Sequence, residues 1–149
     1  MERQPPVGVT MLGLIVLVAG FLSWGTVTGP MQSPFGGDLF GQMTITARID
    51  AWNGSIEPTG VSLPNALVVV AALALVLFAW LRHAGTWRAP RGVSLGLAIY
   101  ALGHVAFLIV MLAGADEATV GVGALLTAAA CVGLLLTAIK EGPAKDPVA

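Results

Sequence analysis

Residues 21–30 read FLSWGTVTGP, and the composition of the chain changes abruptly within this stretch. An almost unbroken apolar run that begins at Val7 reaches Trp24, and the residues that follow are mainly glycine, threonine and proline. Tryptophan favours the boundary between lipid and water, because its ring is apolar and its N–H is polar. We therefore interpret FLSW as the outer end of a membrane span and GTVTGP as the start of an extracytoplasmic loop.

The composition of the whole chain supports a lipid environment. Of the 149 residues, 56% are hydrophobic and only 10% are charged, and the mean hydropathy is +0.87. A soluble domain would carry about 25% charged residues, so lipid must cover much of this surface. The length allows one compact unit, residues 1–149, and the net charge of −1 gives no reason to expect a nucleic-acid partner.

Four stretches come close to the roughly 20 apolar residues that a helix needs to cross a bilayer. They are residues 7–24, 64–81, 93–114 and 118–139. We expect Pro64 in the first turn of the second helix, with Ser62 or Asn65 as its cap. The sequence thus predicts an all-α membrane protein. Its fold is a four-transmembrane-helix bundle with a small β element in the first extracytoplasmic loop, residues 25–63.

The basic residues give the predicted spans a direction. Six of the seven lysines and arginines fall on one side: Arg3, Arg82, Arg88, Arg91, Lys140 and Lys145. The other side holds Arg48 and the acidic residues Asp38, Asp50, Glu57, Asp116 and Glu117. By the positive-inside rule, both termini and the link at 82–91 face the cytoplasm, with Trp80 and Trp87 at the inner interface. The bias toward Ala, Gly, Val and Leu favours a bacterium, and hence a multi-pass protein of its inner (plasma) membrane.

The first outer loop contains a strand signal. Residues 41–52, GQMTITARIDAW, alternate between apolar and polar side chains, as one strand with two different faces would. The turn dipeptide Asn53-Gly54 follows, which suits a hairpin. Because a lone hairpin is marginal in water, we expect a small sheet that rests its apolar face on the outer helix ends. Residues 26–28 are the candidate partner strand.

Apolar side chains in and beside this loop are candidates for protein contacts. We single out Trp24, Phe35, Leu39, Phe40 and Trp52. Phe35, Leu39 and Phe40 either pack under the loop or dip into the interface, or they form a docking surface for another membrane subunit, because exposed apolar patches tend to mark contacts. The predicted partners are therefore the lipid bilayer and other membrane protein subunits or a second copy of the chain.

His104 is the one ionisable residue inside the predicted spans, and such a residue is a functional hypothesis in lipid. It can be a neutral imidazole that hydrogen-bonds a helix carbonyl, Tyr100 or Thr127. Alternatively, it can contact a ligand, either as the polar anchor for a lipid, quinone or other apolar molecule, or as a single axial haem ligand. The spans contain no Asp or Glu, and the lone Cys131 excludes disulfides within the chain and multi-cysteine metal sites. We predict no catalytic residues, no metal site and no cofactor.

Small residues recur on the third and fourth spans, including the pairs Gly92-xxx-Gly96 and Ala129-xxx-Gly133. Such pairs allow helices to approach closely, either within the bundle or between protomers. We therefore expect a non-enzymatic accessory or structural subunit, or a scaffold, of a larger membrane assembly. The alternative is a protein that binds or transports a lipid, quinone or other apolar molecule within the bundle, with His104 as its anchor.

The motif Phe21-Leu22-Ser23-Trp24, the Gly/Thr/Pro-rich loop and the further spans resemble a group of small bacterial four-span membrane proteins. In that group the motif often reads Phe-Leu-Pro-Trp, and Ser23 stands in place of the proline. The resemblance covers about residues 21–81 and implies a layout, not an activity. The layout is also similar to that of claudin-type tetraspans, although this loop lacks their two cysteines.

Overall fold

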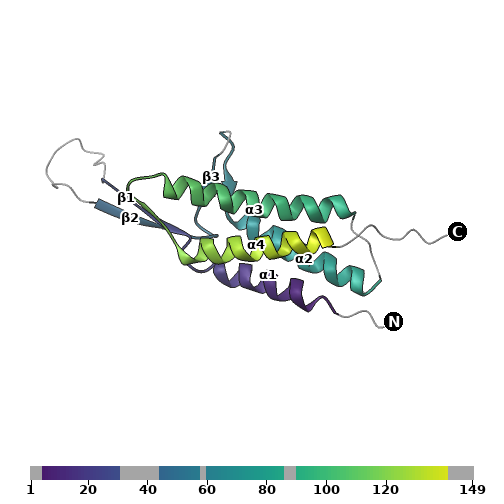
Figure 1. Ribbon diagram of the computed structural model, residues 1–149. Coiled ribbons are helices and arrows are strands. Elements are labelled where there is room, and N and C mark those ends of the chain that lie inside the picture. Colours follow the sequence, from purple (N-terminus) through teal and green to yellow (C-terminus); the bar gives the residue numbers. More distant parts are fainter. Residues whose placement is uncertain (1–4, 31–43, 58–59, 86–89, 141–149) are drawn as a thin grey trace.

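The structure is a computed structural model, and it describes residues 5–30, 44–57, 60–85 and 90–140. Four helices lie side by side in one bundle, and a small sheet stands at one end of it (Figure 1). The helices are α1 (Val7–Ala19), α2 (Ala66–His83), α3 (Arg91–Ala113) and α4 (Val122–Lys140). The strands are β1 (Gly25–Pro30), β2 (Thr44–Ile49), β3 (Ser55–Ile56), β4 (Leu63–Pro64) and β5 (Ala118–Val120).

Three of the four helices are long and apolar enough to cross a membrane: α2, α3 and α4. At 1.5 Å per residue they are about 27 to 35 Å long, close to the thickness of a bilayer core. The shorter α1 has 13 residues and is about 20 Å long. The prediction of one continuous first span as far as Trp24 was wrong, because α1 ends at Ala19 and the chain turns.

The helices pack in a ring, with α1 and α3 each lying against both α2 and α4. The start of α1, the end of α2, the start of α3 and the end of α4 share the end of the bundle that lies opposite the sheet (Figure 1). Small side chains fill much of the interior. On α4 the buried residues are Gly123, Ala124, Thr127, Ala130, Cys131, Leu134 and Ala138. Small residues let helix backbones approach closely, which is how helices associate in lipid.

The sheet has the strand order β2-β1-β5 and is antiparallel throughout. The predicted strand within residues 41–52 is confirmed as β2, and its predicted partner at residues 26–28 is confirmed within β1. The expected start of the fourth span at Ala118 was wrong. Residues 118–120 instead form β5, because they pair with the free edge of β1, and α4 begins at Val122.

The segment before α2 also departs from the prediction. The chain turns at residues 51–53, but the strand that follows, β3, pairs with β4 and not with β2. Pro64 lies in β4 and not in the first turn of a helix. Asn65 occupies the N-cap position of α2 without a capping hydrogen bond from its side chain. That side chain is used elsewhere, and its contacts form the centre of the candidate site.

Candidate functional site

A chain of hydrogen-bonded polar side chains, made of the half-buried Tyr100 and the buried His104 and Asn65, crosses from α3 to the start of α2 near the sheet end of the bundle. His104 is 4% exposed, and Asn65 is fully buried. The Nε2 atom of His104 lies 3.0 Å from Oδ1 of Asn65, and its Nδ1 atom lies 3.2 Å from the hydroxyl of Tyr100. Both ring nitrogens are therefore engaged within the protein. The hydrogen bond to Tyr100 is one of the contacts predicted for His104, whereas Thr127 bonds its own helix through Gly123 O.

Asn65 connects this chain to the turn after β2. Its Nδ2 donates to the carbonyl of Asp50 at 3.2 Å. Within that turn, the carboxylate of Asp50 accepts hydrogen bonds from the backbone N–H groups of Trp52 and Asn53. The Asn53 side chain accepts one in return from the N–H of Asp50. A doubly closed turn of this kind fixes the direction of the Asp50 carbonyl.

The directions of these hydrogen bonds follow from the chemistry of their ends. A carbonyl oxygen only accepts, so the Asn65 amide must turn its NH₂ toward Asp50 and its oxygen toward His104. Nε2 of His104 therefore carries the proton and donates, which leaves Nδ1 as an acceptor. The Tyr100 hydroxyl then donates to Nδ1. The chain runs in one direction, from Tyr100 through His104 and Asn65 to the backbone of Asp50.

A groove of about 280 Å³ lies beside this chain, between α3 and the β3–β4 pair. We call it the α3 groove, and it is lined by Ile56, Leu63, Tyr100, Gly103, His104 and Phe107. Gly103 leaves space there, since a Cβ added to it would meet no atom within 4 Å. The wall is therefore apolar, with the Tyr100–His104 pair as its polar part.

Trp24 does not lie on the surface, contrary to the predicted place at the interface and in a contact patch. It is 0% exposed, and its indole N–H donates to the carbonyl of Ala19 at 2.9 Å. Its backbone N–H donates to Ile49 of β2, and its carbonyl accepts from Gly121. The side chain is covered because the chain turns after α1 and folds it back into the bundle. Trp24 thus joins α1, the sheet and the start of α4.

Trp52 lies at the surface, where it is 50% exposed. Its ring contacts that of Phe21 with centroids 5.3 Å apart. Beside this pair, Arg48 donates to the carbonyl of Phe21 at 2.8 Å. The other predicted contact residues, Phe35, Leu39 and Phe40, lie outside the described part of the chain.

The same face of the sheet carries a polar array next to Arg48. In the strand register, Thr26 lies opposite both Arg48 and Thr119, and Thr28 lies opposite Thr46. Thr26 and Thr119 share a hydrogen bond of 2.7 Å, and Thr28 and Thr46 share one of 3.1 Å. Hydroxyl pairs across strands stabilise a sheet, so this face is ordered and exposed at the same time.

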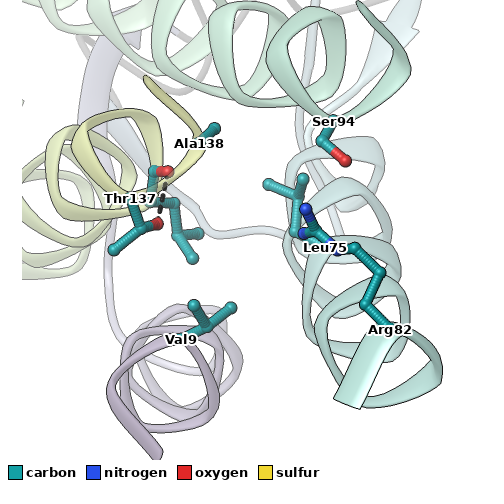
Figure 2. Close-up of a pocket in the computed structure, with 7 residues that line it drawn as sticks. Val9, Leu75, Arg82, Ser94, Thr137 and Ala138 are labelled. Carbon is teal, nitrogen blue, oxygen red and sulfur yellow. Dashed lines mark hydrogen bonds between the residues drawn. The ribbon is translucent and has the colours of Figure 1, made fainter. Parts of the chain in front are cut away.

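A second buried polar group lies at the opposite end of the bundle. Ser94 is 2% exposed, and its Oγ has no hydrogen-bond partner in the part of the chain that the structure describes. Figure 2 shows its hydroxyl in a small cavity between helices, with Val9, Leu75 and Thr137 in the wall and Arg82 reaching in from α2. The cavity measures about 10 Å³, room for roughly one water. The hydroxyl of Thr137 donates to the carbonyl of Leu134.

One face of α3 is lined with small and apolar residues that nothing in the described chain covers. We call it the α3 stripe, and it comprises Gly92, Gly96, Ile99, Gly103, Ala106 and Val110, all exposed. A Cβ on any of the three glycines would meet no atom within 4 Å. Gly133 of the second predicted pair differs, because its Cβ would lie 2.9 Å from Leu12 of α1. Gly92 and Gly96 therefore lie on an uncovered face of α3, whereas Gly133 lies in the contact between α4 and α1.

Within the described residues, no group of three His, Cys, Asp or Glu side chains could hold a metal ion.

Sequence reasoning found His104 and Tyr100 but missed Asn65 as the partner of His104. The signal was a polar residue immediately before an apolar helix, a position at which the sequence predicts a helix cap.

No protein-family model, no curated protein and no solved structure matches this chain.

Proposed function

We propose that the chain is a non-enzymatic, four-span protein of a bacterial inner membrane that acts as a scaffold or accessory subunit. Its contacts use the α3 stripe inside the membrane and the exposed face of the sheet outside it. The observation that carries the proposal is the open space beside Gly92, Gly96 and Gly103.

The α3 stripe has the spacing of a helix contact. Its residues follow one another at intervals of four and three, so they form one row along the helix. Small residues in such a row allow another backbone to come close, and this contact drives association in lipid, where apolar burial alone does not. Val110, at the end of the row near the sheet, is 69% exposed. A transmembrane helix of a second copy or of another subunit fits this face.

The short helix α1 is the fourth span of the proposal. Its hydrogen-bonded backbone continues beyond Ala19, since the N–H groups of Phe21 and Leu22 donate to Val18 and Ala19. In lipid every backbone group needs such a partner. The exposed Phe21–Trp52 pair then lies at the outer interface, a level that aromatic rings favour.

The charges support an orientation with the sheet outside. The end of α2 carries Arg82, and the end of α4 carries Lys140, both at the end of the bundle opposite the sheet. Arg48 and the acidic residues Asp50, Glu57, Asp116 and Glu117 lie at the sheet end. With basic ends in the cytoplasm, the face of the sheet with Arg48 and the threonine pairs is presented to extracytoplasmic partners.

Cysteine cross-linking in native membranes tests the α3 stripe. Gly96→Cys and Ala106→Cys are each made in a Cys131→Ala background, which removes the buried native thiol. Mild oxidation is expected to join two copies if the partner is a second copy of the chain. A benzophenone attached to the same cysteine is expected to capture another subunit if it is not.

Val132→Cys is the matched control, because Val132 is an exposed apolar residue on α4 away from the stripe. Adducts at both stripe positions but not at Val132 support the proposal. If all three positions give equal adducts, or if none does, the α3 stripe is an ordinary lipid-facing surface and the proposal fails.

A further inference from the structure

We propose that the α3 groove binds an apolar molecule with a hydroxyl head, and that this head donates a hydrogen bond to Oη of Tyr100. The candidate ligands are isoprenoid alcohols and quinols. This site adjoins the α3 stripe, since Gly103 belongs to both surfaces, and its depth in the membrane rests on the proposed topology.

The preference for a donor follows from the direction of the hydrogen-bond chain. The only proton of the Tyr100 hydroxyl is directed inward to Nδ1 of His104. His104 cannot reverse this arrangement while neutral, because its Nε2 proton is held by Asn65, whose amide is held by the Asp50 carbonyl. Tyr100 Oη therefore offers the groove lone pairs and no proton. A hydroxyl satisfies it, whereas a quinone carbonyl or an ether, which only accept, does not.

The lining and the volume of the groove restrict the part of the ligand beyond its hydroxyl head. Its lining is apolar apart from the Tyr100–His104 pair, and Phe107, Leu63 and Ile56 supply the walls. A volume of about 280 Å³ is near the lower limit for ligand pockets, about 300 Å³. One apolar chain fits such a space, whereas a macrocycle as large as haem does not. His104 acts here as a positioning residue that fixes the Tyr100 proton, rather than as the anchor itself.

The position of the groove also suits a membrane ligand. Asn65 lies immediately before α2, so the polar chain is at the sheet end of that helix and near the outer interface of the proposed topology. The groove opens beside Gly103 on an exposed face of α3. A molecule dissolved in the bilayer can enter it from the side without crossing the bundle.

A photoreactive analogue tests the proposal with the full-length protein in lipid nanodiscs. The probe is a hexadecanol that carries a diazirine near its head, and the matched probe is its methyl ether. We expect the alcohol to label peptides that contain Phe107 or Leu63 and to bind about tenfold more tightly than the ether, the effect of one hydrogen bond. Equal binding of the two probes would overturn the proposal.

Three variants separate the hydrogen bond from the shape of the groove. Tyr100→Phe keeps the ring and is expected to make the alcohol and the ether bind equally. Gly103→Leu fills the groove and should abolish both, whereas Gly8→Leu, at an open glycine of α1 outside both the groove and the stripe, should change neither. If Gly103→Leu leaves labelling intact while the protein remains folded, the α3 groove is not the site.

Competition identifies the class of alcohol. A prenyl alcohol that displaces the probe assigns an isoprenoid alcohol, and a quinol that displaces it assigns a quinol. The oxidised quinone must compete at least about tenfold less well than its quinol, because it lacks the donor. If the quinone competes as well as the quinol, or if neither the quinol nor the prenyl alcohol competes, the proposal is wrong.

Discussion

Replacing Trp24 by alanine should destabilise the protein more than replacing any exposed tryptophan. Among the described residues, Trp24 is the largest fully buried side chain, and it contacts the start of α4, where a Cβ on Gly123 would lie 2.7 Å from its ring. Removing a buried tryptophan costs about 3–5 kcal/mol through lost contacts and the cavity that remains. We expect about 3 kcal/mol here, because helices in lipid gain less from apolar burial.

Trp24→Phe separates the ring from its N–H. The indole donates to Ala19 O, but this oxygen also accepts from the N–H of Leu22 at 3.1 Å. Loss of the indole bond therefore leaves no orphaned carbonyl, and the cost should be about 1 kcal/mol, near that of an average hydrogen bond. The smaller ring adds a minor cavity cost.

The free energy of unfolding can be measured by titrating the protein, held in mild detergent, with SDS. Far-ultraviolet circular dichroism monitors the loss of helix during the titration. Trp80→Ala is the matched control, since Trp80 also donates its indole N–H, to Thr10, but is 43% exposed. We expect a loss of roughly 0.5–1 kcal/mol for the control. If Trp24→Ala and Trp80→Ala lower the stability equally, Trp24 is not the buried junction described above.

Four further substitutions test the packing and the buried polar groups by the same titration. Gly123→Ala should lower the free energy of unfolding by about 1–3 kcal/mol, because the new methyl group meets Trp24 and two backbone oxygens. Gly96→Ala should leave it unchanged or raise it by up to about 1 kcal/mol, because the new methyl group meets no atom within 4 Å. Equal effects of the two would contradict the close approach at Gly123. Asn65→Leu should lower the free energy of unfolding by about 1–3 kcal/mol, because the Asp50 carbonyl and His104 Nε2 each lose a hydrogen bond. Amide hydrogen exchange in the turn at residues 50–53 should become faster, and unchanged exchange would argue against the hydrogen bond between Asn65 and that turn. Ser94→Ala should leave stability unchanged or raise it, because its buried hydroxyl has no partner in the described chain, and a large loss would reveal one.

The long helices could be predicted because about 20 apolar residues in a row leave a chain few other options in lipid. Strand β2 was also predictable, since its alternating pattern is local. By contrast, β5 is three residues long, and its pairing with β1 brings together segments almost a hundred residues apart. The end of α1 depends in the same way on a distant cause. The chain turns after Ala19 because Trp24 is buried against Gly123, and no local pattern records that contact.

The candidate site was only half predictable for a related reason. His104 stands out in any sequence reading, because an ionisable residue in a span is rare. Its partner Asn65 is an ordinary polar residue at a helix start, where capping is the common role. Only the turn that aims the Asp50 carbonyl at Asn65 gives its side chain a different task.

Helix α3 illustrates why the buried face of an apolar helix cannot be predicted from hydropathy. Ser94, Ala98, Ala101, Val105, Leu108 and Leu112 are buried, while the α3 stripe follows the same intervals two residues earlier and is exposed. A shift of two residues is about 200° around a helix, so the two rows lie on opposite sides. Both rows consist largely of small and aliphatic residues, and hydropathy cannot tell them apart. What does tell them apart is polarity. Ser94 and His104 both lie on the buried side. The His104 ring finds its partners there, Asn65 and Tyr100, whereas the Ser94 hydroxyl faces the small cavity at the other end of the bundle.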